Sequence, residues 1–155
     1  MPYADSDGVR LYYEETGSGY PILFIHEYAG DYLSWEPQLR YFSRRYRCIA
    51  YNARGYPPSA VPEQSGAYGQ DQATDDAYRV LTHLDIGRAH IVGLSMGGFA
   101  AAHFGMRHGA ASRSLVIGGC GYGSAPEEHA KFAGWCRENA DRIDQIGMAE
   151  FGPAY

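Results

Sequence analysis

The stretch 89-AHIVGLSMGGFAAAHF-104 decides the fold, because it joins a buried strand to a helix through one serine between two glycines. Its first residues form the apolar run expected of a strand that is covered on both faces. The Ala- and Gly-rich residues 96–108 that follow have the pattern of a helix. A serine hydroxyl at such a junction is a good nucleophile only where a base takes its proton and nearby donors stabilise the oxyanion.

The junction Gly93-Leu94-Ser95-Met96-Gly97 has the form Gly-x-Ser-x-Gly. Between a strand and a helix this turn is so sharp that it places the serine hydroxyl at the carboxyl end of the sheet. Gly93 and Gly97 avoid clashes with neighbouring elements, and the Met96 amide points from a helix N-terminus toward the reacting oxygen. We therefore predict that Ser95 is a nucleophile. The alternative is a tight turn without chemistry, because the chain has 20 glycines and the pattern also arises by chance.

Strands and helices alternate along the chain, which predicts an α/β fold with a mostly parallel sheet flanked by helices. The apolar and β-prone runs predict strands at 9–16, 22–27, 47–52, 89–94 and 114–119. Helical periodicity predicts helices from about residue 32, at 71–84, at 96–108 and after a capping box at Ser124-Ala-Pro-Glu127. A loop rich in Pro, Gly and Ser fills 53–69.

The composition is that of a soluble globular protein of one ordinary domain, with 155 residues, 45% hydrophobic and 20% charged. The net charge of −5 argues against a nucleic-acid partner, because phosphate binding needs clustered Lys and Arg. No apolar run reaches the roughly 20 residues that span a bilayer, and the N-terminus has no secretory signal. Three cysteines without metal-ligand spacing predict reduced thiols, no metal site and a cytoplasmic protein, with Cys48 and Cys136 buried.

Three motifs, in this order, resemble landmarks of the α/β-hydrolase superfamily: FIHEYAG at 24–30, YNARGYPPS at 51–59 and VGLSMGGFAA at 92–101. They match the oxyanion-hole loop, the Arg-Gly loop after the next parallel strand and the nucleophile elbow. The chain resembles the esterase, lactonase and haloperoxidase-like branch; epoxide hydrolases and haloalkane dehalogenases have aspartate where this sequence has Ser95. The resemblance implies a core over residues 1–123, the start of a cap or lid at 124–155, and no cofactor.

The resemblance also implies roles for individual residues of the first two motifs. The Tyr28 amide would complete the oxyanion hole with that of Met96, but Glu27 stands where most members have glycine, so either the Glu27 or the Tyr28 amide faces the substrate. A solvated Glu27 side chain without a chemical role is the alternative. We expect His26 to fix its loop by hydrogen bonds and Arg54 to brace loops under the site rather than bind an anion. Tyrosines at 28, 32, 56 and 122 are expected at the entrance.

The superfamily order is serine, then an acid, then histidine, and the last two are missing from their expected places. The exit of the sixth strand reads Gly-Cys-Gly at 119–121. His103 and His108 lie on the elbow helix, some 12 and 20 Å from its start at about 1.5 Å per residue. His129 approaches only if the last helix folds over the pocket. We therefore expect the N-terminal portion of a longer enzyme, truncated after the sixth strand, with an apolar edge exposed beside 114–119.

These observations predict a serine hydrolase that acts on a carboxylic ester, a lactone or a related small acyl substrate through Ser95 and a backbone oxyanion hole. The alternative is a non-catalytic α/β-hydrolase-like protein that binds a small ligand, which the missing acid and histidine favour. A nucleotide-binding fold is the weakest reading, because the sequence has neither G-x-G-x-x-G nor Gly-Lys-Ser/Thr. The sequence does not identify the acyl chain, the leaving group or the oligomeric state.

Overall fold

The computed structural model of the chain describes residues 2–121 and 123–154, so Tyr122, expected above at the entrance, lies outside the described residues. The chain divides into two compact units, Met1–Cys120 and Gly121–Tyr155, which are considered separately. The assignment of 124–155 to a cap stays a prediction. Of the helices in the described part, none is long and apolar enough to cross a membrane.

The first unit is built on one six-stranded sheet with the order β1-β2-β4-β3-β5-β6. The last four strands in that order, β4, β3, β5 and β6, run parallel to one another, and β1 and β2 form an antiparallel hairpin beside β4. This confirms the predicted α/β fold with a mostly parallel sheet. The strands are β1 (Tyr3–Ser6), β2 (Val9–Thr16), β3 (Tyr20–Ile25), β4 (Tyr46–Tyr51), β5 (Ala89–Leu94) and β6 (Ser112–Gly118).

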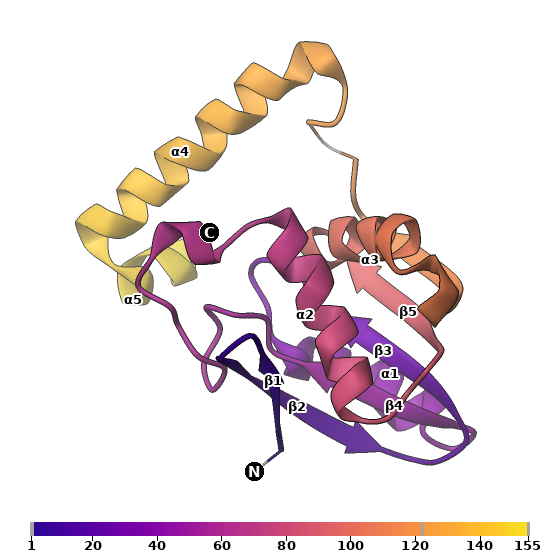
Figure 1. Cartoon of the computed structure of the whole chain (residues 1–155). Helices are drawn as coiled ribbons and strands as arrows, with labels where there is room; N and C mark the ends of the chain where they lie inside the picture. The colour runs from indigo at the N-terminus through magenta and orange to yellow at the C-terminus, as the bar shows by residue number, and fades with distance from the viewer. Residues whose placement is uncertain (1, 122, 155) are drawn as a thin grey trace. The chain divides into compact units, whose positions relative to one another are not determined.

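Helices connect the parallel strands and cover both faces of the sheet, with α2 and α3 on one face and α1 on the other (Figure 1). Each helix of this unit was predicted to within a few residues, and the loop at 53–69 contains turns and one short 3₁₀ helix, η2 (Ser65–Ala67). The helices are α1 (Glu36–Phe42), entered through the 3₁₀ turn η1 (Tyr32–Trp35), α2 (Gln70–His83) and α3 (Met96–Arg107), which is followed by η3 (Gly109–Ala111).

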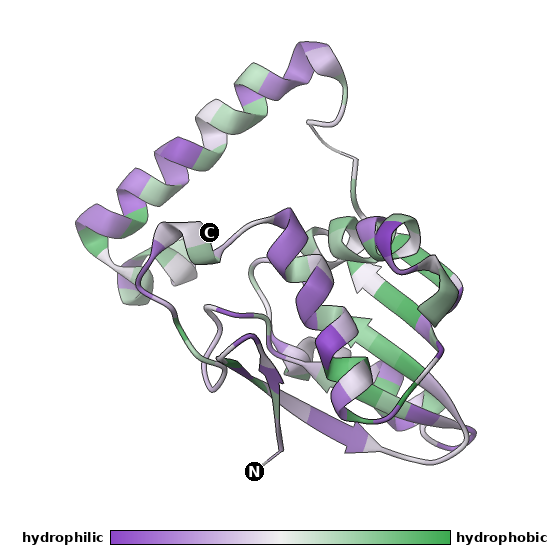
Figure 2. Cartoon of the chain, viewed as in Figure 1, coloured by the Kyte–Doolittle hydropathy of each residue, from purple (hydrophilic) through white to green (hydrophobic). Residues whose placement is uncertain are grey.

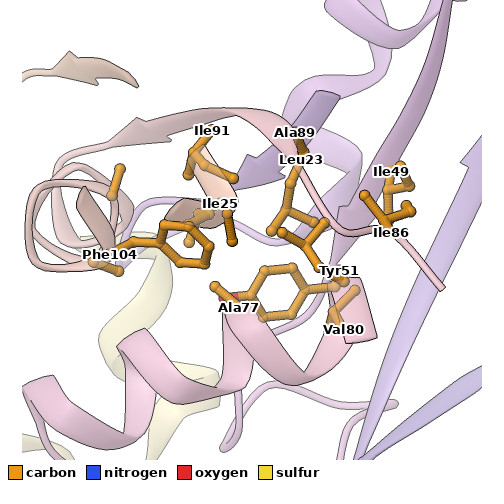
Figure 3. Packing of buried hydrophobic residues seen from close by; sticks show 14 of the residues in the cluster. Leu23, Ile25, Ile49, Tyr51, Ala77, Val80, Ile86, Ala89, Ile91 and Phe104 are labelled. Carbon is orange, nitrogen blue, oxygen red and sulfur yellow. The ribbon is translucent and has the colours of Figure 1, made fainter. Parts of the chain in front are cut away.

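Alternate residues of each central strand point to opposite faces of the sheet, which gives two apolar layers. On the α2 and α3 side, Ile25 and Tyr51 pack with Ala77 and Val80 of α2 and with Phe104 of α3 (Figure 3). On the α1 side, strand residues pack against a buried Trp35. The central strands are accordingly the most hydrophobic elements of this unit, whereas α2 carries its hydrophilic residues on the outer side (Figure 2).

The edge of this sheet is formed by β6, which pairs with β5 alone among the described strands. Its apolar side chains are exposed: Leu115 by 36%, Val116 by 54% and Ile117 by 45%. The expectation of an exposed apolar edge beside 114–119 is therefore confirmed.

The second unit is helical and differs from the prediction in two respects. The prediction of a capping box at Ser124 is wrong, because the Ser124 hydroxyl donates to the Gly121 carbonyl. The 3₁₀ turn η4 (Pro126–Glu128) also comes before the helix. Cys136 is exposed rather than buried, since no residue of α4 is buried, whereas Cys48 on β4 is buried as predicted. A periodic apolar face shows where a helix can pack but not that a partner covers it. The helices are α4 (His129–Ile146), α5 (Met148–Phe151) and the turn η5 (Gly152–Ala154).

Candidate active site

Ser95 is the single residue between the end of β5 and the start of α3. Its backbone has φ 50° and ψ −115°, a left-handed conformation that costs a non-glycine residue on the order of 1–3 kcal/mol. Two backbone hydrogen bonds hold it there: the Ser95 amide donates to the Gly118 carbonyl at 2.8 Å, and the Phe99 amide donates to the Ser95 carbonyl at 3.1 Å. The chain therefore changes direction at one residue, as a sharp strand-to-helix turn requires.

The two flanking glycines are required by the closeness of the surrounding backbone. A Cβ on Gly93 would lie 1.9 Å from the Gly97 carbonyl oxygen, and a Cβ on Gly97 would lie 2.2 Å from the Ile25 oxygen and 2.7 Å from the His26 oxygen. Real Cβ atoms are not found at such distances. The first turn of α3 thus rests directly on the carboxyl end of β3, which brings the loop after β3 to the side of Ser95.

The Ser95 side chain is partly exposed and does not cap α3. Within residues 2–121 and 123–154 no hydrogen bond engages its hydroxyl, so the oxygen is not pinned against a neighbour. Met96 is the first residue of α3, where backbone N–H groups have no acceptor within the helix. A partly exposed hydroxyl beside such an amide is the arrangement that acyl chemistry needs.

His26 lies directly after β3 and is fully buried. The Ala53 amide donates to its Nε2 at 3.1 Å, so the proton is on Nδ1, which lies 2.7 Å from the Glu27 carbonyl and donates to it. Burial lowers the pKa of His26 and favours this neutral form. Both ring nitrogens are occupied, and the residue joins the loop after β3 to the loop after β4.

Tyr56, in the loop after β4, connects the two loops to the serine junction. Its ring packs edge-on against His26 with the centroids 4.6 Å apart. Its hydroxyl donates to the Tyr28 carbonyl at 2.9 Å and lies 3.7 Å from the Met96 sulfur. Tyr28 is 43% exposed beside it. Sequence reasoning placed both tyrosines at the entrance but did not foresee that Tyr56 holds the loops together.

Glu27 accommodates its side chain without backbone strain. The non-glycine residues with positive φ in the described part are Asp7, Asp85 and Ser95, so Glu27 does not need the freedom of glycine. Its Oε1 accepts a hydrogen bond from the Ser34 hydroxyl at 2.9 Å, and a Cβ on Gly30 would lie 2.0 Å from that oxygen. The side chain is partly buried rather than fully solvated, and Oε2 is buried without a hydrogen-bond partner.

Arg54 forms a two-pronged ion pair with Asp76 of α2, at 2.7 Å from Nε and 2.6 Å from a terminal nitrogen, and donates to the Ala67 carbonyl at 2.6 Å. The hydrogen bond with Asp76 raises the pKa of Arg54. This pair fixes the loop after β4 to α2. Sequence reasoning missed Asp76, which is fully buried; its position on the apolar face of the predicted helix, beside Ala73 and Ala77, was the available signal.

Asn52 is a second buried polar residue that sequence reasoning missed. Its Oδ1 accepts from the Tyr32 amide at 2.8 Å, and its Nδ2 donates to the Pro57 carbonyl at 2.8 Å. The Ser59 hydroxyl donates to its backbone carbonyl at 2.7 Å. Asn52 therefore holds the start of η1 against the loop after β4. An asparagine directly after a buried strand was the signal for it.

Comparison with known proteins settles the family, because the profile of the alpha/beta hydrolase fold family matches residues 20–134 of this chain. The chain belongs to the alpha/beta hydrolase fold family. This agrees with the sheet order, the helices on both faces and the strained serine after β5.

Individual relatives of this α/β-hydrolase have several activities. A non-heme haloperoxidase of Rhodococcus erythropolis is 35% identical over 122 residues, which cover 76% of this chain and 44% of the relative. The crystal structure of a carboxylesterase of Nitrososphaera gargenis superimposes with a TM-score of 0.78 at 26% identity, over 97% of this chain and 56% of the other. Est816, described as degrading N-acyl homoserine lactones, gives a TM-score of 0.69 at 32% identity, over 85% and 52%.

The chain thus spans about half the length of each of these three proteins. Other matches include proteins named epoxide hydrolase and 3-oxoadipate enol-lactonase, so membership of the family does not by itself identify the reaction. The reaction has to be argued from the site.

Among the described histidines, several make hydrogen bonds away from Ser95. His90 Nδ1 lies 2.6 Å from the Ser114 hydroxyl and His108 Nε2 lies 2.8 Å from Asp75. His129 Nε2 lies 3.0 Å from the Ser124 carbonyl in the second unit. With both nitrogens of His26 occupied as well, the structure does not identify a base for Ser95. In the part of the chain described, no group of three His, Cys, Asp or Glu side chains is arranged to hold a metal ion.

Proposed function

We propose that this α/β-hydrolase is a serine hydrolase in which Ser95 attacks the acyl carbon of a carboxylic ester, a lactone or a related small substrate. The observation that carries the proposal is the backbone of Ser95, φ 50° and ψ −115° between β5 and α3, with a hydroxyl that no described residue binds. A strained conformation of this kind persists only where the surroundings enforce it, and here the backbone hydrogen bonds of Ser95 with Gly118 and Phe99 do so. Relatives named as a carboxylesterase and a lactone-degrading enzyme support the acyl class.

In the proposed reaction the Ser95 oxygen forms a bond to the acyl carbon while a base takes the hydroxyl proton. The carbonyl oxygen becomes an oxyanion that accepts hydrogen bonds from the Met96 amide and from the amide of Glu27 or Tyr28. The leaving alcohol departs with a proton, and water then releases the acid from Ser95. Such donors are each worth roughly 3–4 kcal/mol of transition-state stabilisation in serine hydrolases.

The base and its acidic partner form the part of the proposal that the described side chains do not supply. The chain covers 44% of the length of the haloperoxidase relative. We therefore place both groups, for the whole protein, outside these 155 residues. The small-molecule substrate, the cytoplasmic location and the lack of a nucleic-acid partner likewise remain predictions from the sequence.

A fluorophosphonate probe tests the nucleophile directly, because it phosphonylates an activated serine. We expect the whole protein to be labelled on Ser95 and the Ser95→Ala variant to remain unlabelled. Ser114→Ala is a matched control, since the same atom is removed at the His90 contact on β6. Labelling that persists in Ser95→Ala would contradict the assignment.

The second candidate is a non-catalytic protein that binds a small ligand in the same place. The observation in its favour is that the hydrogen bonds of His26, His90, His108 and His129 are made to groups other than Ser95. Tight binding of a small acyl compound by the whole protein, without labelling or turnover, would support this candidate over the first.

A further inference from the structure

Glu27 stands between His26, which lies against the serine junction, and Tyr28, which is linked to that junction through Tyr56. On one side, the His26 carbonyl lies so close to Gly97 that no Cβ fits there. On the other side, the Tyr28 carbonyl accepts the hydrogen bond of Tyr56, whose hydroxyl also contacts the Met96 sulfur. The carboxylate of Glu27 is therefore carried by a loop that is fixed to the junction at both of its neighbouring residues.

No described cation neutralises this carboxylate. Its Oε1 has the Ser34 hydroxyl as its partner, and its Oε2 is buried with no hydrogen-bond partner. His26 is held in its neutral form by the Ala53 amide. Arg54, the cation of the loop after β4, is already paired with Asp76.

One oxygen of the Glu27 carboxylate, Oε2, is poorly screened because it is buried. A carboxylate oxygen that water does not reach acts on its surroundings through a lower effective dielectric than an exposed one. Burial lowers the pKa of His26, while its hydrogen bond to the Glu27 carbonyl and the negative charges of Glu27 and Asp31 act to raise it. The Glu27 carboxylate is therefore a negative charge carried by the loop that lies beside the serine junction.

We propose that Glu27 makes this site selective by charge, favouring acyl substrates that carry a cationic group over matched neutral ones and disfavouring anionic ones. The inference rests on the proposed function, since it concerns substrates of Ser95. Its physical basis is that the oxyanion of the transition state and the Glu27 carboxylate repel each other. A cation on the substrate offsets this repulsion, and a second anion adds to it.

Three 4-nitrophenyl esters of similar length and different charge test the proposal: those of 6-aminohexanoate, heptanoate and adipate. We measure kcat/KM for the whole protein and for Glu27→Gln, which keeps an oxygen for Ser34 and the backbone amide but removes the charge. In parallel we measure binding of the corresponding amides, which react far more slowly, to Ser95→Ala and to the double variant Ser95→Ala, Glu27→Gln. We expect a cation-to-anion ratio of kcat/KM of about tenfold or more in the wild type, which falls toward one in Glu27→Gln.

Asp85→Asn is the matched control. It removes the same charge from an exposed residue that lies before β5, at the opposite end of that strand from Ser95. Asparagine tolerates the positive φ of 55° at this position, so the variant folds normally. We expect its cation-to-anion ratio to equal that of the wild type.

The outcomes separate this inference from the proposed function. A ratio that is the same in the wild type and Glu27→Gln, or an equal fall in all three rates, overturns the inference and leaves a structural role for Glu27. If the wild type hydrolyses none of the esters but Ser95→Ala binds the amides in the order cation, neutral, anion, and Glu27→Gln removes that order, the proposed function fails and the charge selectivity stands. Binding that ignores charge overturns the selectivity whether or not the esters are hydrolysed.

Discussion

The serine junction after β5 and the edge strand β6 are neighbours in one sheet, but their side chains have very different surroundings. The Ser95 amide donates to the Gly118 carbonyl at the end of β6, so the two regions share a hydrogen bond. At the junction, Gly93 and Gly97 lie too close to other backbone atoms for a single extra carbon. On β6, Val116 is 54% exposed.

The difference teaches where the identity of a residue matters in this fold. Where backbone packs on backbone, as Gly97 does on the end of β3, only glycine fits and the local geometry is fixed. Where a side chain faces open space, as on β6, any residue with a β-strand preference satisfies the fold. The site lies in the first kind of region, so its geometry should be the more sensitive to mutation.

Among the substitutions that test this comparison, Gly97→Ala should lower the free energy of unfolding most. The added Cβ would lie 2.2 Å from the Ile25 oxygen, and both atoms belong to rigid backbone. Relief requires α3 to move away from β3, so we expect a loss of about 4–5 kcal/mol in the free energy of unfolding. Chemical denaturation followed by circular dichroism measures this value.

Gly109→Ala is the control for that experiment, because no atom lies within 4 Å of its added Cβ and its φ is not positive. We expect a change in the free energy of unfolding of less than about 1 kcal/mol. Equal stability of the two variants would show that the junction yields easily, contrary to the contrast drawn with β6.

Substitution of His26 should have an intermediate, pH-dependent effect on the free energy of unfolding. In the unfolded chain its pKa is near the ordinary 6.5, and burial lowers it in the folded protein. Between the two values the unfolded state binds more protons, so stability is full above about pH 6.5 and is lost as the pH falls toward the folded-state pKa. One proton contributes a slope of about 1.4 kcal/mol per pH unit in that window.

We expect His26→Gln to flatten this dependence below pH 6.5, when the free energy of unfolding is measured by urea denaturation at several pH values. A residual slope should remain, because burial, aided by the charge of Arg113, also lowers the pKa of His90. An unchanged slope in His26→Gln would contradict a lowered pKa of His26 in the folded protein.

The order of elements was predictable from the sequence because buried parallel strands and amphipathic helices have distinct patterns. The runs at 22–27 and 89–94 gave β3 and β5, and the spacing of Ala77, Val80 and Leu81 gave the buried face of α2. The environment of α4 was not predictable. Its periodicity is that of a packed helix, but burial depends on a partner, which no local pattern encodes.

The site was predictable in part, because short motifs mark local turns but do not mark contacts between residues that are distant in the sequence. Ser95 and its glycines form a local turn, so a short motif marks them. Asp76 contributes to the site by pairing with Arg54, 22 residues earlier in the chain, and Asn52 does so by binding the Tyr32 amide. Such pairings between distant segments follow from tertiary structure and leave only an indirect trace, a polar residue where an apolar one is expected.

Val116→Ala tests β6 and should lower the free energy of unfolding least. Its side chain is 54% exposed on the edge strand, so the change removes little buried area and costs mainly β-strand preference, less than about 1 kcal/mol. The same substitution at Val80, which is fully buried against the sheet, should cost about 2–3 kcal/mol through lost burial and a cavity.

The loss of stability should differ between Val116→Ala and Val80→Ala, because the chemical change is identical while the surroundings of the two side chains differ. Denaturation of both variants under the same conditions measures the difference directly. If Val116→Ala costs as much as Val80→Ala, then the outer edge of β6 is covered in solution, and the exposed strand would have a partner that the described residues do not include. If the cost is small, the contrast holds: the junction depends on individual atoms, and the edge beside it depends only on its strand character.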